Sequence, residues 1–108
     1  MSNNQNPTVL FDLLARLKTE SPGVAEAIVN LREAIQKNSA LDSKTANLIA
    51  VGIATALKNT DALAGHISMA KDAGAGRDEV ISAILLAIPS CGVPAVLAAL
   101  PVAWHIYA

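Results

Sequence analysis

The sequence contains very little cysteine: Cys91 is the only one among 108 residues. A single cysteine excludes an intrachain disulfide, a Cys-x-x-Cys redox pair and a multi-cysteine zinc site. This usage is typical of a reducing compartment, and the polar first five residues lack the basic start and apolar core of a signal peptide. We therefore expect a cytoplasmic protein, and we predict no metal site and no cofactor.

Charged residues are also scarce and unevenly distributed. They make up 16% of the chain, the net charge is −1, and the basic residues are scattered. Nucleic acids and anionic membranes are bound through clustered lysine and arginine, so neither partner is predicted. Residues 80–108 carry no charge at all. Prolines and glycine between residues 89 and 94 divide this apolar tail into halves too short to span a membrane, so we expect it in the core and in a subunit interface.

Aromatic residues are few, whereas small aliphatic residues are abundant. The chain has one Phe, one Trp and one Tyr, but 53% of its residues are hydrophobic and 21 are alanine. The apolar residues recur with helical spacing, and no strand of convincing length is present. The sequence therefore predicts one all-α domain over residues 1–108, a bundle of about six helices. Trp104, His105 and Tyr107 give this domain an aromatic C-terminus, which we interpret as an interface anchor.

Helix start and stop signals place these six helices along the chain. Asn6 and Pro7 open the first, Asp42 is the expected N-cap of the third, Asp61 starts the fourth, and Gly74 ends it. A kink is expected at Pro101, inside the last helix. The predicted helices cover approximately residues 7–18, 22–37, 43–57, 61–74, 77–88 and 95–107. The expected inward face of the second helix consists of Ala27, Ile28, Leu31, Ala34 and Ile35.

The fourth helix carries the main catalytic candidate, His66. It lies on an apolar stripe with Leu63, Ile67 and Ala70 at helical spacing, so its imidazole should face inward. Burial should lower its pKa unless a carboxylate is close, which predicts a mostly neutral imidazole at pH 7. Such a group can act as a general acid or base, or serve only as a hydrogen-bonded structural histidine.

Cys91 is the second catalytic candidate and lies in the predicted turn before the last helix. A thiol at this position, near the positive end of that helix, could form a nucleophile and base pair with His66. A lone small cysteine is also commonly inert packing. The sequence leaves both interpretations open.

Several short motifs follow one another between residues 41 and 94. They are Leu41-Asp42-x-Lys44-x-x-x-Leu48-Ile49, Gly65-His66 with Ala70, Gly74-Ala75, Glu79-Val80 and Gly92-Val93-Pro94. In this order and spacing they resemble the carboxymuconolactone decarboxylase family, which includes the alkylhydroperoxidase-D-like proteins. The resemblance implies an alkylhydroperoxidase-D-like fold and a homo-oligomer, trimeric or hexameric.

The resemblance also shows what this chain lacks. The peroxidase branch of the family carries a glutamate on its central helix and a Cys-x-x-Cys-x-x-x-His run on the next helix. With that run aligned on His66, the cysteine positions hold Asn59 and Ala62, and the glutamate position holds Asn47. The chain resembles a divergent member without the dithiol peroxidase centre, because neither an amide nor a methyl group supplies a thiolate or a proton relay.

The residues at these three positions are candidates for lining a substrate pocket. Asn47 and Asn59 either hydrogen-bond to His66 in place of the proton relay or are simply solvated. Three hypotheses about function follow. The protein is a family member of undefined activity, a cofactor-independent enzyme that uses His66 for decarboxylase-like or isomerase-like acid–base chemistry on a small molecule, or a non-catalytic oligomeric binding or scaffold protein.

Overall fold

The computed structural model describes residues 9–108, and this part of the chain consists of helices joined by short turns, with no strand. The helices are α1 (Val9–Glu20), α2 (Pro22–Lys37), α3 (Ser43–Ala56), α4 (Thr60–Asp72), α5 (Arg77–Leu85), α6 (Ile88–Cys91) and α7 (Val93–Ile106). The all-α class and the six expected helices are confirmed. The predicted start at Asn6 and Pro7 and the polar first five residues lie outside the described residues.

The fifth helix ends earlier than expected. It was predicted to reach residue 88, but α5 ends at Leu85 and the chain turns before Pro89. Proline has no N–H to donate to the carbonyl four residues before it, and its ring clashes with that carbonyl, but proline is tolerated in the first turn of a new helix. The predicted turn around Cys91 is consequently the single-turn helix α6.

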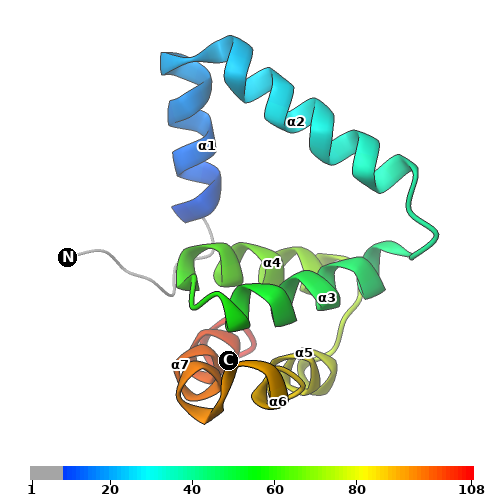
Figure 1. Ribbon diagram of the computed structural model, residues 1–108, viewed down its shortest axis with the longest axis vertical. Helices are drawn as coiled ribbons and strands as arrows, with labels where there is room; N and C mark the ends of the chain where they lie inside the picture. The colour runs from blue at the N-terminus through cyan, green and yellow to red at the C-terminus, as the bar shows by residue number, and fades with distance from the viewer. Residues whose placement is uncertain (1–8) are drawn as a thin grey trace.

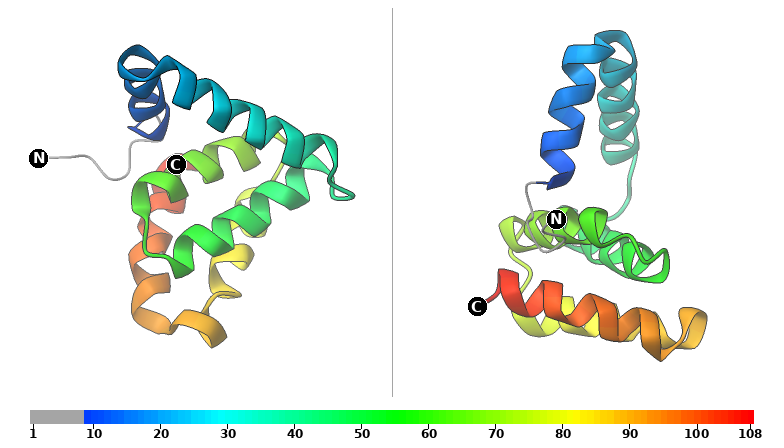
Figure 2. Two further views of the ribbon diagram at one scale, coloured as in Figure 1. Left: turned by 45° about the horizontal axis from the view of Figure 1, so that its top comes forward. Right: turned by 90° about the vertical axis from the view of Figure 1, so that its left-hand side faces the viewer.

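The helices form three layers (Figure 1). Helices α3 and α4 lie side by side in the middle layer, α5, α6 and α7 lie on one side of it, and the α1–α2 hairpin lies on the other (Figure 2). The core fills the space between the middle layer and α5 and α7. Its largest fully buried side chains are Leu63, Ile67, Ile84, Val51, Val80, Val96 and Val102.

The α1–α2 hairpin contributes little to this core. Ala25 is the one buried residue of α2, and Ala25, Ile28 and Arg32 are the side chains on its less exposed face. Leu31 and Ile35, which were expected to face inward, are each 62% exposed. The predicted inward face of α2 is therefore wrong apart from Ile28, because the hairpin projects from the bundle and leaves the other four side chains exposed.

Side-chain caps fix the starts of three helices. Asp42 caps α3 as predicted, since its Oδ1 accepts a hydrogen bond from the Thr45 N–H at 2.7 Å. Glu79 Oε1 accepts from the Gly76 N–H at 3.0 Å at the start of α5. Helix α4 begins at Thr60 and not at Asp61, because the extended backbone of Asn59 lets its Oδ1 accept from the Ala62 N–H at 3.1 Å.

Two residues of the family motifs also stabilise the fold. Lys44 Nζ of α3 lies 3.1 Å from Glu79 Oε2 of α5, so an ion pair joins the starts of these two helices. The hydrogen bond from the Gly76 N–H, and then that from Lys44, lower the pKa of Glu79. Both side chains are exposed, so this pair positions the helix starts and adds little free energy.

The C-terminus of the chain is held by Tyr107. Its hydroxyl donates to the Ala75 carbonyl at 2.6 Å, and Lys71 Nζ donates to the Ile106 carbonyl at 3.1 Å. The Lys71 ammonium also lies 5.2 Å from the centre of the Tyr107 ring. Tyr107 therefore works inside the subunit, whereas Trp104 and His105 remain exposed as interface candidates. Helix α7 continues through Pro101 to Ile106.

The uncharged tail divides between core and surface. Helix α7 buries Ala95, Val96, Ala99, Leu100, Val102 and Ala103, whereas Val93, Leu97 and Trp104 are exposed. Across residues 9–108, no helix combines the length and the apolar character that crossing a bilayer requires.

Candidate functional site

A pocket of about 370 Å³ lies between α2, α3 and α4, and His66 lines it. The other lining residues are Arg32, Ile35, Gln36, Ser39, Leu41, Ser43, Ala46, Asn47, Ala50 and Met69. One wall is apolar and the remainder carries hydroxyl, amide, imidazole and guanidinium groups. Arg32 is the one charged residue of this lining, which contains no carboxylate and no thiol.

His66 comes from the middle of α4 and is half-buried. Its Nδ1 is inaccessible to solvent and has no hydrogen-bond partner among the described residues. Desolvation by burial, and then the positive charge of Arg32, lower the pKa of His66 below the ordinary value of 6.5. The predicted direction of this pKa shift is confirmed. A neutral imidazole in the wall of a pocket can exchange a hydrogen bond or a proton with a bound ligand.

Arg32 reaches the pocket from α2. Its Nη2 donates to the Met69 sulfur at 3.6 Å, and a thioether is a weak acceptor. Arg32 makes no ion pair within residues 9–108, so most of its donors stay available to a ligand. A guanidinium fork matches the two oxygens of a carboxylate. Arg32 was not predicted as a site residue from the sequence. Ala25, Ile28 and Arg32 stand at positions i, i+3 and i+7, a spacing that places them on one helix face.

Asn47 is the one pocket candidate that the structure places beside His66. It is half-buried in α3 and lines the same pocket. Its Nδ2 donates to the Ser43 carbonyl at 2.9 Å, so this amide N–H group binds its own helix and not the imidazole.

Asn59 and Ala62 do not line the His66 pocket. Asn59 caps α4 and borders a smaller pocket against α7, and Ala62 packs against the hydrophobic core. Both lie closer to the start of α4 than His66 does. The expectation that Asn47, Asn59 and Ala62 share one pocket with His66 therefore holds only for Asn47.

Cys91 lies far from this pocket in the layered arrangement. It belongs to α6, and the α3–α4 layer separates α6 from α2 (Figures 1 and 2). Its side chain packs against the hydrophobic core, and its Sγ lies 3.8 Å from the Gly92 carbonyl oxygen. The structure forms no Cys91–His66 pair and agrees with the packing interpretation of this cysteine.

The part of the chain that the structure describes offers no cluster of three or more His, Cys, Asp or Glu side chains able to hold a metal ion. The polar residues around His66 are instead an arginine, two amides and two serines. This donor set suits an organic anion better than a metal cation, because guanidinium has only donors and repels cations.

Comparison with known proteins agrees with this architecture. The family model described as Carboxymuconolactone decarboxylase family matches residues 22–104, so the chain belongs to that family. The matched region extends from the start of α2 into α7 and includes the whole His66 pocket. No curated protein and no solved structure matches the chain.

Proposed function

We propose that this family member is a cofactor-independent enzyme that binds a small organic acid in the His66 pocket and uses His66 to move a proton. One observation carries the proposal: the half-buried imidazole of His66 lines the same pocket as the guanidinium of Arg32, and no acidic residue lines it. A volume of about 370 Å³ suits a small metabolite.

Arg32 would bind and orient the ligand. Its fork takes the carboxylate, and Ser43, Asn47 and Gln36 offer hydrogen bonds to further oxygens. The apolar side chains of Ile35, Leu41, Ala46 and Ala50 would contact the ligand's carbon skeleton. Binding of an anion also neutralises the positive charge that disfavours protonation of His66.

His66 would then act as the general base. The neutral imidazole takes a proton from an acidic C–H or O–H of the bound acid, and the electron pair of that bond stays on the ligand. The imidazolium returns the proton to another ligand atom, so the enzyme ends unchanged. No thiol lines the pocket, which separates this chemistry from that of a dithiol peroxidase.

The protein would work as a homo-oligomer, trimeric or hexameric by family resemblance. Leu31, Ile35 and Leu86 are 62%, 62% and 77% exposed, and such large apolar surfaces are commonly covered by a partner. Sedimentation should therefore show a species heavier than the 11.1 kDa monomer. A cytoplasmic location remains part of the proposal, supported by the single free cysteine.

The test is a panel of small 2-oxo, 2-hydroxy and lactone acids, monitored by shifts of ¹⁵N amide resonances for binding and by proton exchange or product formation for turnover. We expect Arg32→Gln to weaken binding and His66→Gln to abolish turnover while binding persists. Arg16→Gln is the matched control, because Arg16 is exposed in α1 and pairs with Glu20.

Three outcomes discriminate the hypotheses. Turnover that survives His66→Gln would refute the assigned base, and binding that is insensitive to Arg32→Gln would refute the carboxylate site. Binding of acids without any turnover would favour a non-catalytic binding protein. The amide of Asn47 in this pocket also supports that function, because an amide provides no proton relay.

A further inference from the structure

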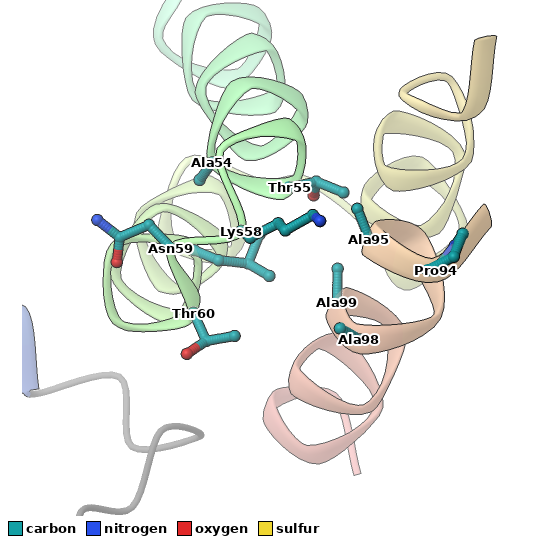
Figure 3. Close-up of a pocket in the computed structure, with 10 residues that line it drawn as sticks. Ala54, Thr55, Lys58, Asn59, Thr60, Pro94, Ala95, Ala98 and Ala99 are labelled. Carbon is teal, nitrogen blue, oxygen red and sulfur yellow. The ribbon is translucent and has the colours of Figure 1, made fainter. Parts of the chain in front are cut away.

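A second pocket, of about 130 Å³, lies between the end of α3, the start of α4 and the first turns of α7 (Figure 3). Its lining residues are Ala54, Thr55, Lys58, Asn59, Thr60, Leu63, Pro94, Ala95, Ala98 and Ala99. None of these residues lines the His66 pocket. We call this the Lys58 pocket.

The walls of the Lys58 pocket are apolar. Alanines at positions 54, 95, 98 and 99 keep the space open, and Leu63, which is 1% exposed, lies beneath it. Figure 3 shows the amide of Asn59 and the hydroxyl of Thr60 pointing away from α7. The buried hydroxyl of Thr55 is already satisfied, because it donates to the Val51 carbonyl at 2.9 Å.

Lys58 supplies the one charged group of this pocket. Its side chain is exposed and extends from the α3–α4 turn toward α7, so its amine lies at the mouth of the pocket (Figure 3). The amine makes no hydrogen bond or ion pair within residues 9–108, and no acidic residue lines the pocket. An ammonium at the edge of an apolar pocket is the complement of a carboxylate on a short hydrocarbon chain.

The backbone of Lys58 makes this placement notable. Its φ of 58° lies in the left-handed region, where glycine is the usual residue and where Gly74 ends α4. An L-residue in this conformation costs roughly 1–2 kcal/mol. The α3–α4 turn therefore has an unfavourable backbone conformation at the same residue whose amine points toward the pocket.

We propose that the Lys58 pocket binds a short aliphatic monocarboxylate, with its tail among the alanines and its carboxylate at the Lys58 amine. An engineered cavity of about 150 Å³ accepts benzene, which has six non-hydrogen atoms, so this slightly smaller pocket suits a four-carbon acid. The proposal is independent of the function assigned to His66. A ligand this small and partly exposed should bind with a dissociation constant of about a millimolar.

Sodium butyrate is the probe, added to the ¹⁵N-labelled full-length protein while amide resonances are recorded. Butyrate should produce saturable shifts at residues 58–60 and 95–99, whereas butylammonium of the same length should not. Lys58→Gln should raise the dissociation constant of butyrate about threefold to fivefold, as expected for one partly exposed charge pair. Lys37→Gln, which removes an exposed lysine of α2, should leave the constant unchanged.

Four further variants keep the test independent of folding. Lys58→Gly preserves the left-handed turn and removes the amine, so it should weaken butyrate binding as much as Lys58→Gln. Ala98→Leu, at an exposed position on the pocket wall, should obstruct the tail, whereas Ala27→Leu on an exposed face of α2 should not. Arg32→Gln should leave these shifts intact, which separates this pocket from the His66 pocket.

The proposal is overturned by any of three results. They are the absence of saturable butyrate shifts at residues 58–60 and 95–99, equal affinity of the wild type and both Lys58 variants, and equal shifts with butylammonium. Each result contradicts the assigned ligand class while leaving the His66 proposal standing.

Discussion

Helices α3 and α4 end in the same hydrogen-bond pattern but with different residues in the left-handed position. The Lys58 N–H donates to the Thr55 carbonyl at 3.1 Å and the Asn59 N–H to that of Ala54 at 3.2 Å. The Gly74 N–H donates to the Lys71 carbonyl at 3.0 Å and the Ala75 N–H to that of Ala70 at 2.9 Å. This is the Schellman motif, which glycine favours because it has no Cβ.

Introducing glycine at the end of α3 and removing it at the end of α4 should therefore change the free energy of unfolding in opposite directions. The left-handed conformation costs an L-residue roughly 1–2 kcal/mol, a cost that glycine avoids. The greater entropy of the unfolded chain with glycine offsets about 0.5–1 kcal/mol of this gain. Lys58→Gly should therefore raise the free energy of unfolding by about 0.5–1 kcal/mol, and Gly74→Ala should lower it by a similar amount. Lys58→Ala keeps the strained backbone and should be nearly neutral, which isolates the backbone effect from loss of the amine.

Gly23 provides the matched control. A Cβ added at Gly74 or at Gly23 would meet no atom within 4 Å, so neither substitution is sterically blocked. Gly23 lies in the first turn of α2 and does not have a positive φ. Gly23→Ala should therefore stabilise by about 0.5 kcal/mol, although the same change destabilises at Gly74.

Urea unfolding followed by far-ultraviolet circular dichroism measures these differences. All variants are compared at one protein concentration, because the stability of the proposed oligomer would depend on concentration. The transition midpoint should move while the slope with urea stays constant. A stabilising Gly74→Ala, or a destabilising Lys58→Gly, would refute the reasoning.

Substitutions at three other residues test separate features. Tyr107→Phe removes the hydroxyl bond to the Ala75 carbonyl but keeps the ring, so it should cost about 1 kcal/mol in urea unfolding; no loss would contradict that bond. Asp42→Ala should lower the urea midpoint and Asp42→Asn should largely restore it, since only the latter keeps a cap. The lowered pKa of His66 means that this histidine binds a proton more readily in the unfolded chain, so the free energy of unfolding should fall as the pH drops below 6.5. His66→Gln should flatten this pH dependence, and an unchanged slope would disprove burial of a neutral imidazole.

The sequence alone predicted those features of the fold that depend on local interactions. The helical class, most helix boundaries and the Asp42 cap depend on residues within four positions of one another, and the structure confirms them. The lowered pKa of His66 was also predictable, because an apolar stripe on one helix indicates burial without reference to any other helix. Local signals were ambiguous at the start of α4, because Asn59 and Asp61 can both cap a helix and the structure uses Asn59.

Tertiary packing decided which residues meet in a site. The sequence offered Cys91 as a partner of His66, but the α3–α4 layer separates them, and Arg32 of α2 lines the His66 pocket instead. The apolar stripe of α2 suggested an inward face that the projecting hairpin leaves exposed. The Lys58 pocket likewise exists only because α7 packs against the α3–α4 turn, whereas the left-handed conformation of Lys58 belongs to the local helix end. Spacing along a helix determines which side chains share a face, whereas the angles and layers in which helices pack determine what that face contacts.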